Sequence, residues 1–207
     1  MKSGEEKVSL KTLVTFFKQK EIGMWVFILM FYYAFLGPFF VFLKPYLISE
    51  GFSPDEVASY VGIYGGIIGF LGGIVASIIG KKYHKKTLLI LFGSFNILSA
   101  IFLVCIEYLD ILNFAFFIAI VSSNSIALAF SSAIIFSLIM DYSRSSSKAI
   151  DYSLQTSLFS LTRVLSAVGA GMIVSAYGFG VMFVFETLGM IVVLFIIYKF
   201  YKVKQYK

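Results

Sequence analysis

The stretch VASYVGIYGGIIGFLGGIVASIIGKKYHKK (residues 57–86) places a long apolar run directly before a cluster of lysines. Residues 57–79 carry no charged side chain. A bilayer core about 30 Å thick is crossed by about 20 apolar residues in a helix, so this run is long enough to span it. Because a backbone in lipid must satisfy its own N–H and C=O groups, the run predicts a transmembrane helix.

Five further runs of the same kind occupy most of the remaining chain. They cover residues 22–43, 87–106, 114–140, 152–176 and 181–200. Hydrophobic residues make up 59% of the sequence and charged residues 14%, which excludes a water-soluble globular protein. We therefore predict an all-α polytopic membrane protein with six transmembrane helices over residues 22–200. A leader with a short amphipathic segment (1–21) precedes the bundle and a tail (201–207) follows it.

The basic residues fall into every second gap between the runs. Cytoplasmic loops of membrane proteins are enriched in Lys and Arg, so this asymmetry predicts that both termini lie in the cytoplasm. Only Lys44 lies in one of the other gaps, and Arg163 lies inside a run. The basic residues of the leader, the second gap, the fourth gap and the tail are Lys2, Lys7, Lys11, Lys18, Lys20, Lys81, Lys82, Lys85, Lys86, Arg144, Lys148, Lys199, Lys202, Lys204 and Lys207.

The net charge of +6 raises the question of nucleic-acid binding, for which KKYHKK (81–86) is the best local candidate. A short loop between two spans is better explained by lysines that face lipid headgroups, so we expect the lipid bilayer and no nucleic acid as a partner. The single Cys105 excludes an internal disulfide, and the single His84 lies in a loop. We therefore expect no metal site, no cofactor and no enzymatic activity.

Several polar side chains lie near the centre of the predicted spans, where burial in lipid is costly. Solute sites of transporters lie at this depth, so we predict that these residues line a solute cavity. For the two asparagines an interhelical hydrogen bond is an equally good interpretation, and the arginine has a structural ion pair as its alternative. The candidates are Tyr32, Tyr33, Asn96, Asn124 and Arg163.

Two more polar residues lie nearer the ends of the spans. Glu186, about five residues from the outer edge of the sixth run, is a candidate for carrying a coupling proton. Its alternative role is a hydrogen bond to a neighbouring residue near the interface. Gln155 lies one turn inside the fifth run and is predicted to line the inner mouth of the cavity.

The loop between the fourth and fifth runs carries charges of both signs. We predict that Asp151 caps the fifth helix and that Asp141 pairs with Arg144 or Lys148. These residues are candidates for a gate at the inner side of the membrane.

Backbone and aromatic signals mark the ends of the first and last spans. Pro38 after Gly37 removes a backbone donor, which predicts a kink in the first span. Trp25, Tyr201 and Tyr206 lie at the predicted membrane boundaries, and we interpret them as interfacial anchors.

The residues around the second loop resemble the loop motif of the major facilitator superfamily, G-x-x-x-D-R/K-x-G-R/K-R/K. Gly73, Gly80, Lys81 and Lys82 match the motif, which makes them gating-loop candidates. The chain departs from the motif at two positions: Ser77 stands where the motif has an acidic residue, and Ile78 stands where it has a basic residue. With six spans and a leader similar to a central linker, the chain resembles the C-terminal half of such a transporter.

Two longer stretches are similar to the muropeptide and acetyl-coenzyme A permease group and to siderophore-uptake permeases. They are PYLISEGFSPDEVASYVGIYGG (45–66) and MDYSRSSSKAIDYSLQTSLFSLTRVLSAVGAG (140–171). The resemblance implies proton-coupled uptake of a small solute across a bacterial inner membrane, by rocking of two six-helix halves. It also implies that Arg163 and Gln155 line the cavity.

A transporter of this kind has twelve spans, so the resemblance implies a second six-helix half as a partner. The chain is then a split or truncated C-terminal half, one subunit of a homodimer, or an inactive remnant. A membrane subunit that only scaffolds a partner and transports nothing is the alternative from another functional class.

Overall fold

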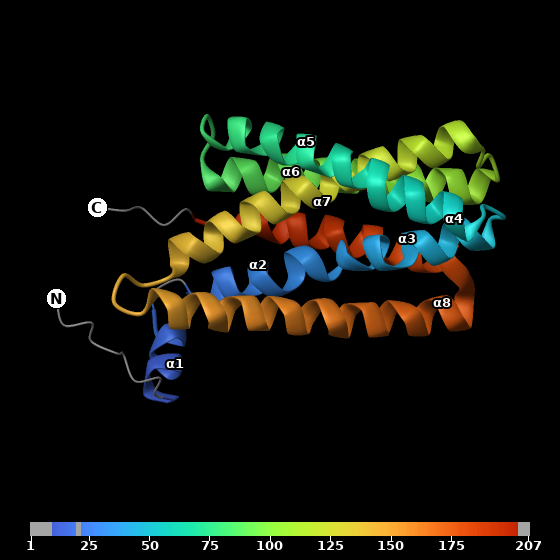
Figure 1. Cartoon of the computed structure of the whole chain (residues 1–207). Coiled ribbons are helices and arrows are strands. Elements are labelled where there is room, and N and C mark those ends of the chain that lie inside the picture. Colours follow the sequence, from blue (N-terminus) through green and yellow to red (C-terminus); the bar gives the residue numbers. More distant parts are fainter. Residues whose placement is uncertain (1–9, 20–21, 203–207) are drawn as a thin grey trace.

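A computed structural model describes residues 10–19 and 22–202, so the leader before Leu10 and the tail beyond Lys202, with Tyr206, lie outside the described residues. All regular structure in the described part is helical, which confirms the predicted all-α fold. Apart from the short first helix, which runs across the others, the helices lie roughly along one axis in Figure 1. They are α1 (Leu10–Phe17), α2 (Ile22–Ala34), α3 (Gly37–Ser49), α4 (Pro54–Val57), the π-helix η1 (Ala58–Tyr64), α5 (Gly65–Gly80), α6 (Lys85–Leu109), α7 (Phe114–Tyr142) and α8 (Lys148–Phe200).

Helix α8 consists of two membrane crossings. Its 53 residues are divided by Gly178, whose φ of 85° and ψ of 175° are not helical. Glycine adopts this positive φ without the steric cost that a side chain would add. We call residues 148–177 the first arm and residues 179–200 the second arm. Five helical segments of the described chain are long and apolar enough to cross a membrane, and the division of the last one at Gly178 gives six crossings: α2–α3, α4–η1–α5, α6, α7 and the two arms.

The predicted kink in the first span is present. Helix α2 ends at Ala34, and α3 begins at Gly37 with Pro38 at its second position. Proline has no N–H to donate and its ring collides with the preceding turn, which explains the break. Pro45 lies inside α3, which continues to Ser49.

A glycine face joins the second crossing to the fourth. A Cβ atom on Gly65 would lie 2.9 Å from the Ser125 hydroxyl of α7, and one on Gly72 would lie 3.3 Å from Ala129. Small residues allow helix backbones to approach this closely in a membrane. At Gly66, in contrast, a Cβ atom would meet no other atom within 4 Å, so the space beside it is open.

The α2–α3 crossing packs between the two arms of α8. Phe159 of the first arm contacts Tyr33, and Phe183 of the second arm stacks on Phe39. The second arm also packs along α6, where Leu194 covers Gly93. This arrangement places the core around α2–α3 and leaves one side of α5 exposed.

The two ends of the bundle carry opposite charges. The basic end contains residues 81–86, the loop 143–147 and the end of α8 (Figure 1). Glu50 and Asp110 follow the last residues of α3 and α6 at the opposite end, together with Glu107. Burial, followed by the charges of Glu107 and Asp110, raises the pKa of the Glu50 carboxyl.

Candidate functional site

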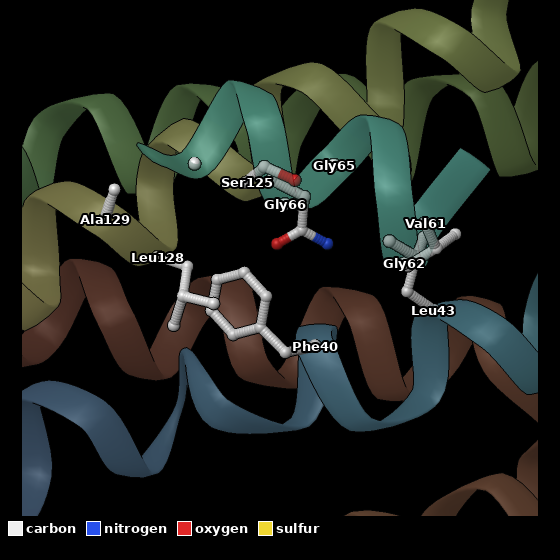
Figure 2. Close-up of a pocket in the computed structure, with 11 residues that line it drawn as sticks. Phe40, Leu43, Val61, Gly62, Gly65, Gly66, Ser125, Leu128 and Ala129 are labelled. Atoms are coloured by element: carbon white, nitrogen blue, oxygen red, sulfur yellow. The ribbon is translucent and has the colours of Figure 1, made fainter. Parts of the chain in front are cut away.

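A cavity of about 420 Å³ lies between α3, the η1–α5 crossing and α7. Figure 2 shows the ring of Phe40 on one side of it and Gly65 and Gly66 on the other. The space exists because glycines present no side chain on this face of the crossing. A π-helix widens the backbone spacing at Val61 and Gly62, and such segments are common at functional sites.

Two polar side chains project from α7 into this otherwise apolar cavity. Asn124 and Ser125 line it together with Phe40, Leu43 and Leu128. Asn124 is buried, and within the described residues its amide has no hydrogen-bond partner. A side-chain amide offers two donors and an acceptor, so Asn124 is free to bind a polar solute.

Arg163 lies on an exposed surface of the first arm, and the rings of Tyr33 and Phe40 lie between its guanidinium and this cavity. Its guanidinium carbon is 5.4 Å from the centre of the Tyr33 ring and 5.8 Å from that of Phe159. The Tyr33 ring in turn lies 6.4 Å from the ring of Phe40, which lines the cavity. Aromatic faces orient a guanidinium without neutralising its charge, so Arg163 retains all its hydrogen-bond donors for an anionic partner.

Asn96 and Tyr32 lie deeper in the bundle than the cavity. The Asn96 amide is 2.6 Å from the Ser131 hydroxyl, which ties α6 to α7, and the Tyr32 hydroxyl donates to the Leu89 carbonyl at 3.2 Å. Asn96 and Asn124 meet at a void of about 10 Å³, which is about the smallest space that holds one water molecule. The structure therefore brings the two asparagines together and places Tyr32 against α6.

Glu186 is buried in the second arm, with 3% of its surface exposed. Its Oε2 atom has no hydrogen-bond partner among the described residues. A carboxylate without a partner is costly to bury, whereas its protonated form is neutral. Glu186 does not line the cavity near Asn124.

Gln155 is the centre of a buried polar cluster at the basic end, apart from the cavity described above. It accepts a hydrogen bond from Trp25 Nε1 at 2.6 Å and donates to the Ile139 and Asp151 carbonyls and the Ser143 hydroxyl. Trp25 is fully buried and its ring stacks on Tyr142 at 4.8 Å. The interpretation of Trp25 as an interfacial anchor is therefore wrong, because its ring is buried and its indole N–H donates a hydrogen bond to Gln155 inside the bundle.

Tyr201 is also buried, with its hydroxyl 3.5 Å from that of Tyr142. Its predicted interfacial role is wrong for the same reason. A boundary position in the sequence does not fix whether an aromatic ring faces lipid or protein.

Arg144 and Asp151 form a bidentate ion pair that closes the loop between α7 and α8. Arg144 Nη2 donates to Asp151 Oδ1 at 2.7 Å and Nε donates to Oδ2 at 2.8 Å. Arg144 also donates to the Thr15 hydroxyl of α1 at 2.9 Å. Helix α8 begins at Lys148 with Ser147 at its N-cap, so Asp151 is one turn inside and does not cap it.

Asp141 pairs with Lys85 of α6 at 3.4 Å, a partner that was not predicted from the sequence. Lys85 also donates to the Ser137 hydroxyl. The remaining gating-loop candidates lie at the basic end of the second crossing: Gly73 and Gly80 in α5, then Lys81 and Lys82 in the exposed turn.

Phe40, Ser125 and Lys85 were not among the residues predicted from the sequence. Phe40 is one of 24 phenylalanines, and nothing in the sequence distinguishes it from the others. Ser125 could have been found, because it follows Asn124 directly. Lys85 belongs to a cluster of several lysines, and the sequence does not distinguish it from the others.

Comparison with known proteins agrees with this arrangement. A family model described as Major Facilitator Superfamily matches residues 2–167. The chain is 28% identical over 151 residues to a protein of Rickettsia prowazekii (strain Madrid E) named putative transporter AmpG 1. The aligned region covers 72% of this chain and 33% of that protein. The chain thus spans about a third of the length of this curated relative.

Proposed function

The chain belongs to the major facilitator superfamily, and we propose on that premise that it is the C-terminal half of a secondary active transporter. Its solute is a small anionic compound such as a muropeptide-like molecule or a siderophore. Uptake is coupled to protons and occurs by alternating access across a bacterial inner membrane. The lysine-rich basic end, with both termini, faces the cytoplasm.

The observation that carries this proposal is the unpaired guanidinium of Arg163 at membrane depth. Within the described residues Arg163 has only the rings of Tyr33 and Phe159 beside it and no carboxylate in an ion pair. Keeping such a charge in a membrane is costly unless it faces water or a ligand. A solute whose carboxylate binds Arg163 and whose polar groups bind Asn124 and Ser125 contacts both parts of the site, the guanidinium and the cavity.

A second six-helix half completes the site. The cavity beside Asn124 lies at one side of the bundle, and solute sites of inverted-repeat transporters lie between two such halves. The partner is a separate chain or a second copy of this chain. In this proposal the gating-loop residues and the Arg144–Asp151 pair open and close the cytoplasmic side, and the ion pair across the loop between α7 and α8 supports that role.

Filling the cavity tests its role directly. Gly66→Leu adds a side chain where no atom lies within 4 Å, so the helix tolerates it while the cavity shrinks. We expect uptake of a labelled muropeptide or ferric siderophore to fall about tenfold or more, since pockets discriminate strongly against lost volume. The assay uses cells that express the chain together with its partner half.

The matched control for this variant is Gly23→Leu. Gly23 is exposed near the start of α2, outside the cavity, and also has no atom within 4 Å. Equal uptake by both variants would show that the cavity plays no part in transport.

Glu186 is proposed to carry the coupling proton, because it is buried without a partner for Oε2. Glu186→Gln keeps the shape of the protonated side chain and removes its titration. Uptake driven by a pH gradient should then fall to the rate supported by the solute gradient alone, while solute exchange continues. Proteoliposomes with and without an imposed pH gradient provide this measurement.

Thr187→Val is the control for Glu186→Gln. Among the residues that the structure describes, the Thr187 hydroxyl contacts only the Phe183 carbonyl of its own helix, to which it donates a hydrogen bond. Unchanged coupling in Glu186→Gln would assign the buried carboxyl a structural role instead.

The alternative is a membrane subunit, or a remnant of a transporter, that supports a partner and moves no solute. The match covers only a third of the length of the relative from Rickettsia prowazekii, and this fraction by itself favours neither the transporter nor the non-transporting subunit. This alternative expects variants of Arg163 to alter assembly and leave solute flux unchanged.

A further inference from the structure

A second cavity, of about 270 Å³, lies at the basic end between α5, α6 and α7. Its wall is apolar and includes Leu88, Phe92 and Ile134. Lys85, Ser77 and Ser137 add polar groups to the lining. A cavity with a charged group beside an apolar wall matches an amphiphile whose head is anionic.

The charge at this cavity is positive overall. Lys85 has three N–H donors, and it contacts the Ser137 hydroxyl and the Asp141 carboxylate, which is 3.4 Å away. About a third of each charged side chain remains exposed, so the pair is open to a further ligand. Lys81 and Lys82 lie within four residues of Lys85, so the basic residues near this cavity outnumber the carboxylate of Asp141.

Ser77 is a second polar residue at this cavity. It is exposed in α5, lines the cavity, and its hydroxyl has no hydrogen-bond partner among the described residues. The loop motif that this chain otherwise resembles has an acidic residue at this position. A carboxylate there would repel an anion beside Lys85, whereas a hydroxyl can donate a hydrogen bond to it.

We propose that this cavity binds a phosphate group, with Lys85, Ser77 and Ser137 as its ligands. Basic pockets between helices at the cytoplasmic side of membrane proteins bind anionic lipid headgroups. The apolar wall gives the acyl chain of a phospholipid a place to lie, and inorganic phosphate is the other source of the same chemistry. This site is separate from the transport cavity and does not depend on the proposed transport.

The test measures retention of phosphatidylglycerol and phosphatidylcholine by the purified chain in detergent, using native mass spectrometry. The wild-type chain should retain phosphatidylglycerol in preference to phosphatidylcholine. Ser77→Asp and Lys85→Gln should each lower this retention about fivefold or more. Because Ser77 is exposed, we expect Ser77→Asp to fold, and this variant tests the proposal even if Lys85→Gln does not fold.

The matched control is Lys86→Gln, which removes the same charge from the neighbouring position. Lys86 Nζ lies over the ring of Tyr198, 5.9 Å from its centre, and does not line the cavity. Its retention of phosphatidylglycerol should change less than twofold. An equal loss in Lys85→Gln and Lys86→Gln, with no loss in Ser77→Asp, would mean diffuse electrostatic attraction and would overturn the proposal.

Inorganic phosphate distinguishes the two sources of the ligand. Displacement of the lipid by millimolar phosphate, sensitive to Ser77→Asp, supports a site that recognises the phosphate group alone. Retention of the lipid under the same conditions supports a site that also needs the acyl chain. Phosphatidylcholine carries the same phosphate group with a choline cation beside it, so equal retention of the two lipids by the wild-type chain would contradict recognition of an anionic group and would overturn both forms of the proposal.

Discussion

Arg163→Ala is expected to lower solute uptake by about thirtyfold or more while leaving insertion into the membrane unchanged. A hydrogen-bonded charge pair with a ligand is worth about 2 kcal/mol, and that energy corresponds to about a thirtyfold change in binding. Removal of the guanidinium breaks no ion pair within the described residues, so the fold should not suffer. Uptake by cells and the amount of chain in the membrane fraction are measured together.

Two further variants identify the cause of any loss. Arg163→Lys keeps the charge but loses the planar donor array, so an intermediate rate is expected. Val164→Ala changes the adjacent residue, which is 62% exposed, and should transport normally. Full uptake by Arg163→Ala would refute the proposed cavity role, and altered assembly with normal flux would favour the scaffold alternative.

Asp151→Ala is expected to lower the free energy of unfolding by about 3 kcal/mol. Asp151 is completely buried, and it accepts two side-chain hydrogen bonds and the backbone N–H of Arg144. Loss of one partner leaves the other charge uncompensated, which costs about 3–5 kcal/mol for a buried pair. The lower value is appropriate because 23% of the Arg144 side chain is exposed. Thermal or denaturant unfolding of the purified chain in detergent measures the change.

Asp141→Ala is the matched control for this prediction. The Lys85–Asp141 pair is longer, at 3.4 Å, and both side chains are about one-third exposed. Partly exposed pairs contribute about 1 kcal/mol or less, so a small loss is expected. Equal losses in the two aspartate variants would show that burial does not set the strength of the Arg144–Asp151 pair.

Features that depend on the composition of a single segment could be predicted from the sequence. The apolar length of each run specified a helix, because lipid offers the backbone no other way to satisfy its polar groups. Pro38 specified the break between α2 and α3 for a similarly local reason. Ser53 and Glu56 form a capping box at the start of α4, and their spacing of three residues is a local signature that can be recognised in the sequence.

Features that depend on the rotation of one helix against another could not be predicted in this way. Nothing in the sequence indicates that Trp25 donates to Gln155, 130 residues away, or that Asp141 pairs with Lys85. Each charged residue had several partners within reach along the sequence, and packing selected between them. The same selection placed Asn124 beside an open cavity and bonded Asn96 to Ser131.

The surrounding solvent, the helical class, the number of crossings and the family all follow from the amino-acid sequence, because each depends on the composition of continuous segments. Which polar residues share a site depends instead on how the helices pack. Arg163 lies far along the sequence from Tyr33 and Phe40, and it meets the Tyr33 ring only when α8 packs on α2–α3. Helix rotation in lipid is set by side-chain packing, which the hydrophobicity of a segment does not encode.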